Sequence, residues 1–471
     1  MTNDEFIKRA HELVDWIGNY LGNIDEYPVK SQVKPGEIYS SLPENPPHKG
    51  ENFSDIFNDF NEIIMPGITH WQSPNFFAYF PANSSAPSVL AEMLIAAMGT
   101  QCMIWETSPA AAELEERVMN WLRDLIGLPE NFEGVIQDTA STAALAALVT
   151  ARERICDFRI NENGFKGEPV YRIYGSTQTH SSIEKAVKIA GFGRNNLVKV
   201  DVRDDLSLDP DKLRKAIEKD LDKGYIPCCI VATVGTTGTM AVDPVKAIGE
   251  ICSRYNIWLH VDAAMAGTAL ILPEYSWLIE GKEYIDSFVF NPHKWMFTNF
   301  DCSAYFVKDA GQLIKTFEIL PEYLKTRTRG QVNDYRDWGI PLGRRFRALK
   351  LWFVIRSFGL EGLREKVRNH ISYAAWLAAR VNEHHDFEMT APLSLNTVCF
   401  RYRPEGTNEK YRNDINEKLN HILNDTGRIY LTHTKINGKY SLRMVTSQTN
   451  VELKHIEQAW ALITEKASTI Q

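Results

Sequence analysis

The stretch that decides the fold is IWLHVDAA (257–264), which is followed along the chain by DSFVFNPHKW (286–295). Each begins as a short apolar run, which is typical of a strand buried on both faces of a sheet. Each then ends in a charged side chain, Asp262 in the first stretch and Lys294 in the second. Lysine is rarely buried and an unpaired buried carboxylate is costly, so both side chains need a partner or a use.

Five further apolar runs alternate with segments of helical spacing, such as AAAELEERVMNWLRDLIGLP (110–129). This alternation predicts an α/β domain with a largely parallel sheet. In such sheets, ligands bind where the strands end. The further runs are GVIQ (134–137), YRIYGS (171–176), LVKVDV (197–202), CCIVATVG (228–235) and CSAYFVK (302–308).

Changes of pattern along the chain predict three parts. Residues 1–84 form a helical segment that is broken by the Pro-rich link at 40–51, is unsuited to folding alone and is expected to pack on a dimer partner. Residues 85–354 form the large sheet domain, and residues 355–471 form a smaller α+β domain. The expected elements of the last part are strands near NTVCFRY (396–402) and YSLRMV (440–445) and a final helix in VELKHIEQAWALITEK (451–466).

Composition narrows the class of function. The chain has 471 residues, 44% of them hydrophobic, and a formal net charge of −8, so it lacks the basic footprint of a nucleic-acid-binding protein. Its seven cysteines are scattered without a CxxC pair, which predicts a reducing, cytoplasmic setting. We find no signal peptide and no apolar run long enough to span a bilayer, and we expect neither a membrane partner nor a metal.

Asp262 and Lys294 together match the needs of one cofactor. Pyridoxal 5′-phosphate (PLP) requires a lysine that forms an imine with its aldehyde and a carboxylate that pairs with its pyridinium nitrogen. Taken singly, each residue also has a plain structural explanation. Asp262 could cap the next turn, and Lys294 could extend its amine to water beside an aromatic ring.

Two further stretches offer cofactor contacts. In GVIQDTASTAALAALVTARER (134–154), a strand gives way to a helix that starts near Ala140 and Ser141, and free amides at a helix N-terminus suit a phosphate group. Ordinary N-capping explains the same pattern, and Asp138 would repel a phosphate if it pointed inward. In YGSTQTHSS, His180 follows another strand, where its ring could stack on a flat cofactor or lie in a surface loop.

These residues lie in motifs that carry a family resemblance over essentially the whole chain. The sequence resembles the aromatic L-amino-acid decarboxylases, which are PLP-dependent group II decarboxylases of fold type I. The resemblance implies a mixed, mostly parallel seven-stranded sheet with helices on both of its faces. The distance from HVDAA to NPHKW is the most specific part of this resemblance. The motifs are HWQSPNFFAYFPANSS (70–85), HVDAAMAG (260–267), DSFVFNPHKW (286–295), NFDCSA (299–304), DYRDW (334–338) and IPLGRRFRALKLW (340–352).

The resemblance implies a role for each candidate residue. Lys294 would form the Schiff base with PLP, and Asp262 would pair with the pyridinium nitrogen. His180 and Ala264 would lie against opposite faces of the cofactor ring. Tyr323, in a mobile catalytic loop, would donate a proton to the α-carbon with assistance from His180. The other implied cofactor contacts are Ala140, Ser141 and Asn291 at the phosphate, and Thr237 and His293 at other parts of the cofactor.

The resemblance also implies an aromatic pocket and a homodimer. The run from His70 to Pro81 would line the substrate pocket, whose flat apolar walls suit an aromatic amino acid. This run holds no Lys or Arg to meet a second carboxylate, which argues against glutamate. Some of its rings could instead pack in the dimer interface, where the partner would add Met103 and Ile104. The implied substrate contacts are Trp71, Tyr79, Phe80, Pro81, Ala82, Met103 and His180.

Three functions are compatible with these residues. The first is decarboxylation of aromatic L-amino acids (tyrosine, DOPA, phenylalanine, tryptophan or 5-hydroxytryptophan) to arylalkylamines and carbon dioxide. The second is aldehyde synthesis, but family members that form aldehydes have phenylalanine in place of Tyr323 or asparagine in place of His180. The third is a non-enzymatic dimeric binding protein. Gln72, Ala82 and Met103 depart from the better-known animal enzymes, which leaves the preferred amino acid open.

Two polar stretches have simpler interpretations. GRRFRALK (343–350) favours a helix with salt bridges over a nucleic-acid patch, because its neighbours are apolar and the whole chain is acidic. TRTRGQVND (326–334) is polar, contains a glycine and lacks apolar periodicity. That composition is typical of a mobile lid and equally of a surface loop.

Overall fold

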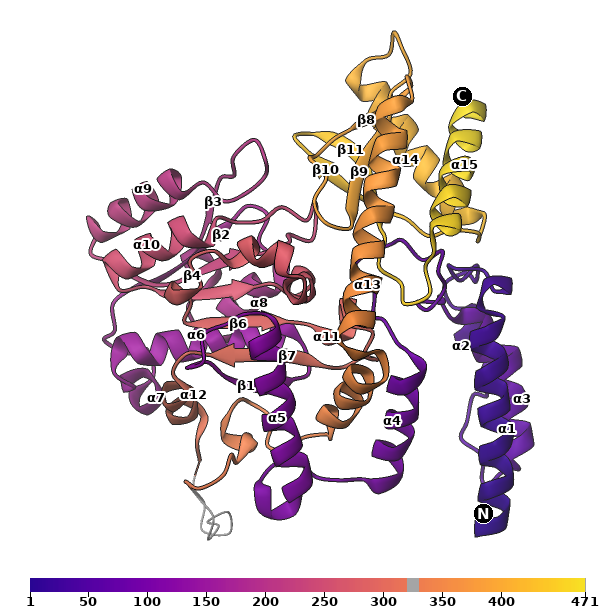
Figure 1. Ribbon diagram of the computed structural model, residues 1–471, viewed down its shortest axis with the longest axis horizontal. Helices are drawn as coiled ribbons and strands as arrows, with labels where there is room; N and C mark the ends of the chain where they lie inside the picture. The colour runs from indigo at the N-terminus through magenta and orange to yellow at the C-terminus, as the bar shows by residue number, and fades with distance from the viewer. Residues whose placement is uncertain (320–329, 471) are drawn as a thin grey trace. The chain divides into compact units, whose positions relative to one another are not determined.

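The seven apolar runs form one sheet. Its strands are β1 (Glu133–Gln137), β2 (Tyr171–Ser176), β3 (Leu197–Val200), β4 (Ile226–Thr233), β5 (Trp258–Asp262), β6 (Ser287–Phe290) and β7 (Ser303–Val307). Their order is β1-β7-β6-β5-β4-β2-β3 (Figure 1). Neighbouring strands are parallel, except that β7 is antiparallel to both β1 and β6. The prediction of a mixed, mostly parallel seven-stranded sheet is therefore confirmed.

Helices cover both faces of this sheet, as expected. Connections between parallel strands are right-handed. The face that a connecting helix covers therefore depends on the direction in which the chain passes along the sheet from one strand to the next. The connection from β2 through α8 (Ser181–Ile189) moves one way, and those through α9 (Pro210–Leu221) and α10 (Val245–Tyr255) move the other way (Figure 1). Helix α6 (Ala140–Cys156) packs against α8 and contacts β1 and β4–β7, so it shares the face of α8.

Small side chains let α6 lie close to the sheet. Its residues Ala143, Ala144, Ala146, Ala147 and Ala151 are each at most 1% exposed. At its start, the side chain of the N-cap residue at position 139 accepts the amide N–H of the residue at position 142. The helix therefore begins where the sequence predicts, with two residues between it and the end of β1. Its first turn lies at the carboxyl edge of the sheet, where ligands bind in this class of fold.

The computed structural model describes residues 1–319 and 330–470, which group into two units. The sequence-based division at residues 84 and 354, with the first part packed on a partner, stays a prediction. The large unit comprises Ala82–Ile371 and Ala391–Thr397, and the small unit comprises Met1–Pro81, Ser372–Thr390 and Val398–Gln471. The other helices that begin in the large unit are α4 (Ala86–Met98), α5 (Pro109–Leu125), α7 (Arg159–Asn163), α11 (Pro292–Trp295), α12 (Ala310–Phe317) and α13 (Arg347–Glu383).

The small unit contains a four-stranded sheet in the order β10-β11-β9-β8, with α14 and α15 packed against each other and α14 against β11. Its N-terminal helices contribute little to the core, and no residue of α1 is buried. Among residues 1–319 and 330–470, no helix is both long and apolar enough to cross a membrane. The elements are α1 (Asn3–Gly22), α2 (Glu37–Ser41), α3 (Phe53–Asp59), β8 (Phe387–Met389), β9 (Thr397–Tyr402), α14 (Glu409–Asp425), β10 (Thr432–Ile436), β11 (Lys439–Val445) and α15 (Leu453–Thr469).

The basic stretch at 343–350 is neutralised by carboxylates within the large unit. Helix α13 begins only at Arg347, but four of the basic side chains make ion pairs. Arg344 pairs with Glu115 (2.6 Å), Arg347 with Asp301 (2.9 Å) and Lys350 with Glu92 (3.1 Å), and Glu92 also pairs with Arg345. The predicted salt bridges are therefore confirmed, and the predicted helix is confirmed from Arg347 onward. All seven cysteines are buried, and none of them forms a disulfide.

Buried neutral histidines should make the large unit sensitive to acid. His370, in α13, is 1% exposed and accepts the indole N–H of Trp295 (2.9 Å). Desolvation lowers its pKa to about 3, with Lys366 adding to the effect. Between this pKa and the ordinary value near 6.5, the unfolded chain binds a proton that the folded chain does not. The stability contributed by His370 is therefore fully present above pH 6.5 and is lost as the pH falls.

We expect His370→Asn to flatten the pH dependence of unfolding, because asparagine does not titrate. Urea unfolding of the parent and the variant at pH 7.5, 6.0 and 5.0 measures this. Below about pH 6.5 the parent should lose roughly 1.4 kcal/mol more per pH unit than the variant. Parallel pH profiles for the two proteins would contradict the assignment of a neutral buried His370.

Candidate active site

Asp262 and Lys294 lie at the carboxyl edge of the sheet. Strands β5 and β6 are parallel neighbours, with Asp262 opposite Val289. Beyond the strands, the amide N–H of Asn291 donates to the carbonyl of Ala264 (3.0 Å), which keeps the two chain segments together. Asp262 is 6% exposed, and Lys294 is half-buried in the one-turn helix α11. The structure therefore brings the predicted carboxylate and amine to one edge.

His180 is the N-cap residue of α8, and the charges of Asp262 and Lys294 both influence its pKa. Its Nδ1 accepts the amide N–H of Ser182 (3.2 Å) and lies 2.7 Å from Ser182 Oγ, so the neutral ring carries its proton on Nε2. Desolvation lowers the pKa of His180, Asp262 opposes this shift, and Lys294 adds to it. The imidazole is therefore neutral at neutral pH and lies within electrostatic reach of both charged groups.

The first turn of α6 presents backbone amides at this edge. Ala140 and Ser141 open the helix, so their N–H groups have no carbonyl four residues earlier in the helix. The carboxylate of Asp138 accepts the amide N–H of Thr139 (2.6 Å). Asp138 is thus engaged with its own turn, and the two following amides remain suited to an anion.

The other predicted cofactor contacts differ in exposure. Asn291 is buried, and its Oδ1 accepts the hydroxyl of Ser303 at the start of β7 (2.6 Å). Thr237 is exposed in the loop after β4, and Ala264 is half-buried beside Asp262. His293 is buried, and its Nδ1 accepts the amide N–H of Cys302 (2.9 Å), while desolvation lowers its pKa to about 3. These contacts make His293 a neutral support of the turn.

Comparison with known proteins decides the family. Residues 35–403 match the pyridoxal-dependent decarboxylase conserved domain. The chain belongs to this family. Phenylacetaldehyde synthase from Arabidopsis thaliana is 42% identical, over 99% of this chain and 97% of its own length. Tyrosine decarboxylase 2 from Narcissus pseudonarcissus is 41% identical, over 100% of this chain and 95% of its own length.

Solved structures of the pyridoxal-dependent decarboxylase family agree with the fold. The crystal structure of Oryza sativa TDC with PLP and tryptamine has a TM-score of 0.96 at 36% identity, and the match covers 100% of this chain and 99% of that one. The predictions of the family, of fold type I and of PLP as the cofactor are therefore confirmed. Family membership also favours the enzymatic interpretations over a binding module.

The residues of this pyridoxal-dependent decarboxylase fit PLP. Asp262 Oδ1 accepts the amide N–H of Ala264 (3.1 Å), whereas Oδ2 has no hydrogen bond to any residue of 1–319 or 330–470. Such an oxygen suits a pyridinium N–H, which is both a hydrogen-bond donor and a cation. The amides of Ala140 and Ser141 suit the phosphate, and the Lys294 amine suits the aldehyde. Asp262, Ala140, Ser141 and Lys294 would therefore hold the cofactor.

Contacts between aromatic rings hold together the run that is predicted to line the substrate pocket, within the small unit. Trp71 stacks on Tyr79, with centroids 5.8 Å apart and planes at 18°, and packs against Phe76 at 4.4 Å. Tyr79 is 47% exposed, Phe80 is half-buried and Pro81 is buried. Ala82, Met103 and Ile104 belong to the large unit. Ala82 and Met103 are half-buried and Ile104 is buried.

Two residues that support this run were missed by sequence reasoning. Arg443, in β11, donates to the carbonyl of Tyr79 (2.9 Å), and its guanidinium lies 4.7 Å from the centroid of the Phe80 ring. Tyr430 Oη lies 3.3 Å from Tyr79 Oη, and its ring meets Tyr79 edge-on at 5.9 Å. An arginine inside the apolar run YSLRMV was the available signal. The predicted proton donor Tyr323 lies outside the described residues, as does the first part of TRTRGQVND.

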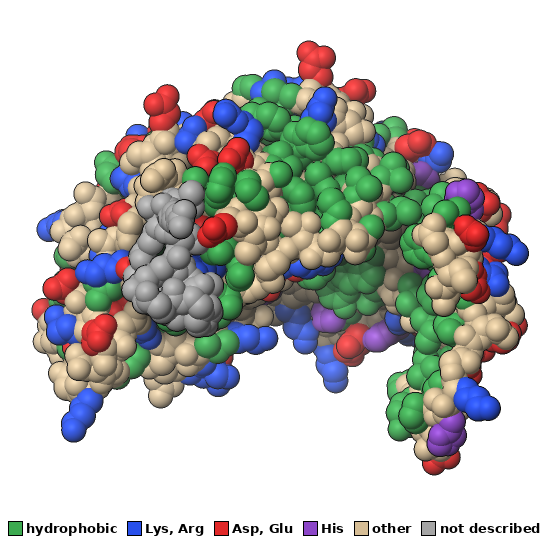
Figure 2. Space-filling view, turned by 90° about the horizontal axis from the view of Figure 1, so that it is seen from below, with side chains coloured by type: hydrophobic (Ala, Val, Ile, Leu, Met, Phe, Trp, Pro, Cys, Tyr) green, Lys and Arg blue, Asp and Glu red, His purple; other side chains and the backbone are tan. Residues whose placement is uncertain are grey.

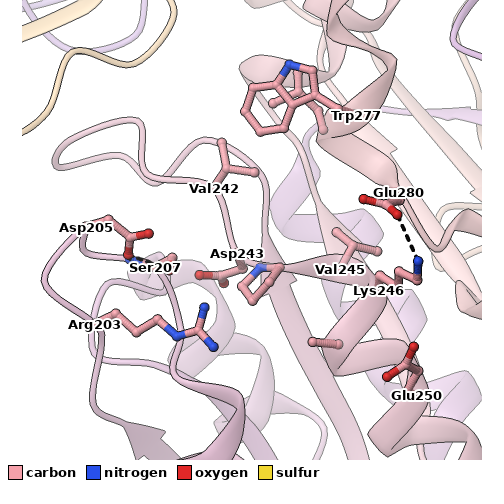
Figure 3. Close-up of a pocket in the computed structure, with 13 residues that line it drawn as sticks. Arg203, Asp205, Ser207, Val242, Asp243, Val245, Lys246, Glu250, Trp277 and Glu280 are labelled. Carbon is pink, nitrogen blue, oxygen red and sulfur yellow. Dashed lines mark hydrogen bonds and ion pairs between the residues drawn. The ribbon is translucent and has the colours of Figure 1, made fainter.

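A separate cavity of about 380 Å³ in the large unit contains none of the predicted site residues (Figure 3). Asp243 on its wall is already satisfied, because its oxygens accept the amide N–H groups of Leu208 (2.7 Å) and Thr233 (2.8 Å). Lys246 pairs with Glu280 (2.9 Å). We therefore assign the active site to the sheet edge. The cavity is lined by Arg203, Asp205, Ser207, Val242–Ala247, Glu250, Trp277, Leu278 and Glu280.

We expect Asp262→Asn to weaken PLP retention and to lower turnover on the order of 100-fold, because a neutral amide no longer favours the protonated ring nitrogen. Bound PLP after gel filtration and the initial rate measure the two effects. Asp220→Asn is the matched control, since Asp220, in α9, is also buried but pairs with Arg172 and Tyr174 of β2. Parental cofactor content and turnover in Asp262→Asn would refute the assigned role.

Proposed function

We propose that the chain decarboxylates aromatic L-amino acids to the corresponding arylalkylamines and carbon dioxide. The observation that carries this proposal is the convergence of Asp262, Lys294 and His180 at one sheet edge in a member of the pyridoxal-dependent decarboxylase family. Near full-length relatives include a tyrosine decarboxylase, and the structural neighbour Oryza sativa TDC holds PLP and tryptamine. Tyrosine, DOPA, phenylalanine, tryptophan and 5-hydroxytryptophan remain the candidate substrates.

Each of the proposed catalytic residues would have a distinct role in the reaction. When bound, PLP supplies a ring that accepts the electron pair left as the carboxylate departs from the α-carbon. Lys294 would attach the cofactor through its amine, and Asp262 Oδ2 would keep a proton on the ring nitrogen. His180 would cover one face of the ring as a neutral imidazole with a proton on Nε2. Tyr323 would return a proton to the α-carbon, since a phenol stays protonated near neutral pH.

Aldehyde synthesis is the second candidate function, because phenylacetaldehyde synthase and tyrosine decarboxylase 2 are almost equally similar to this chain. Overall identity therefore does not separate the two reactions. The retained pair His180 and Tyr323 favours decarboxylation, because replacement of one of them is the departure expected in the aldehyde-forming relatives. Aldehyde formation also consumes oxygen and releases ammonia and hydrogen peroxide, which makes the two reactions easy to distinguish by their products.

We further propose that the active form is a homodimer in the cytoplasm. Helix α1 is amphipathic. Its Trp16 packs against Phe60 and its Tyr20 against His70, but Phe6, Ile7 and Val14 stay exposed and are suited to burial by a partner. Figure 2 shows many hydrophobic side chains on the exposed surface. A second copy of the chain would bury such side chains and could bring Met103 to the partner's substrate pocket. On α1 and α4 the exposed large hydrophobic residues are Phe6, Ile7, Val14, Leu90, Met93, Leu94 and Met98.

Lys294→Ala should abolish turnover and covalent attachment of PLP while leaving a folded protein. The reason is that alanine removes the only group assigned to bind the cofactor aldehyde. A panel of aromatic amino acids and glutamate, with amine, aldehyde and carbon dioxide measured together, tests the parent and the variant. Appreciable turnover by Lys294→Ala would refute the role of Lys294, and ammonia and peroxide formed at the rate of carbon dioxide would refute decarboxylation by the parent.

Tyr323→Phe should shift the products from amine toward aldehyde, because the phenol that returns a proton to the α-carbon is lost. The measurement is the ratio of amine to aldehyde for the best substrate of the panel. The control is Tyr39→Phe, since Tyr39 is an exposed tyrosine of α2 to which no role is assigned. Amine alone at the parental rate in Tyr323→Phe would exclude Tyr323 as the donor.

A further inference from the structure

The helix that carries Lys294 is too short to satisfy its own carbonyl groups. Helix α11 has four residues, and the carbonyl of Pro292 accepts the amides of Met296 (3.2 Å) and Thr298 (3.4 Å). The chain then leaves the helix through Phe297 at φ 56°, so no further helical amides reach the carbonyls of His293 and Lys294. Buried carbonyl groups without donors are costly, so donors must come from elsewhere in the fold.

Asn83 supplies both donors. Its backbone N–H donates to the carbonyl of His293 (3.0 Å), and its side-chain Nδ2 donates to the carbonyl of Lys294 (2.5 Å). Asn83 is 1% exposed, so water does not compete for these bonds. Both Asn83 and Lys294 belong to the large unit, although 211 positions separate them in the chain.

We propose that Asn83 is a positioning residue that fixes the peptide of Lys294 and thereby aims its side chain. The proposal rests on the function assigned to Lys294 above. Asn83 acts on the lysine through its main chain and not through its amine. Without the amide donor, the carbonyl of Lys294 would lose this hydrogen bond, and the turn would rotate toward another donor. A rotation of this single turn displaces the amine at the far end of a long side chain.

Neighbouring residues distinguish this role from general fastening of the loop. Ser85 Oγ donates to the carbonyl of Phe297 (2.7 Å), and Ser88 Oγ accepts the amide N–H of Asn299 (2.7 Å). These bonds tie the same two segments together, but they act three and five residues beyond Lys294. Asn83 alone among them holds the peptide of the lysine. Ser85→Ala is therefore a matched control that also removes one buried hydrogen bond.

The test compares the parent, Asn83→Asp, Asn83→Ala and Ser85→Ala as PLP-loaded full-length proteins. Asn83→Asp keeps the size of the side chain and the backbone bond to His293 but replaces the donor by an acceptor. Asn83→Ala removes the donor without adding charge. The readouts are the dissociation constant of PLP, the pH at which the visible absorbance of the bound cofactor titrates, kcat and KM for an aromatic amino acid, and the melting temperature of the cofactor-free protein.

We expect all three variants to melt below the parent, since each loses a buried hydrogen bond. Only the Asn83 variants should weaken PLP binding, by about 10-fold, and shift the titration of the bound cofactor. They should lower kcat more than they change KM. If Asn83→Asp does not fold, Asn83→Ala decides the outcome. Cofactor binding and titration in the Asn83 variants that equal those of Ser85→Ala would overturn the proposal.

The cofactor readouts also separate this proposal from the proposed function. PLP binding and its titration are measured without turnover. A parent protein that binds PLP but decarboxylates no aromatic amino acid would refute the proposed function and leave the test of Asn83 intact. A parent protein that forms amines, with Asn83 variants that retain PLP as Ser85→Ala does, would refute only the role of Asn83.

Discussion

The parallel pairing of β5 with β6 is the constraint on which the candidate site depends. Because the two strands end at the same edge, Asp262 at the end of one and Lys294 in the turn after the other are delivered to one place. The helix dipole and free amides of α6 open at that edge as well, because only two residues separate β1 from α6. The order and direction of the strands are therefore enough to bring together a carboxylate, an amine and the anion-binding start of a helix.

Burial makes this arrangement chemically useful and also costly. Desolvation lowers the pKa of His180, and one oxygen of Asp262 has no hydrogen bond within the described chain, which suits a cationic ring nitrogen. The same desolvation penalises every unpaired main-chain group at the edge. Specific donors satisfy such groups. The hydroxyl of Ser303 donates to Asn291, and the amides of Asn83 donate to carbonyls of the α11 turn. The support of the site is thus set by the need to pair buried polar groups.

Much of the fold could be predicted from the sequence, because strand and helix periods are local properties. The seven apolar runs, the start of α6 and the final helix all appear where the pattern places them. The antiparallel direction of β7 could not be predicted, since CSAYFVK has the same composition whichever way it runs. The support of the aromatic run by Arg443 was likewise missed, because a charged residue in an apolar strand does not reveal which distant carbonyl it bonds.

The sequence by itself determined which residues are capable of chemistry. Apolar runs that end in Asp262 and Lys294 and the resemblance of the surrounding motifs are written in residue type and spacing, which need no coordinates. Only the tertiary structure decided how these residues are held. The bond between Asn83 and the peptide of Lys294 joins positions 211 apart, and its existence depends on the path of the whole intervening chain. Hydrogen-bond partners at that separation are decided by packing, because local periodicity carries no information about them.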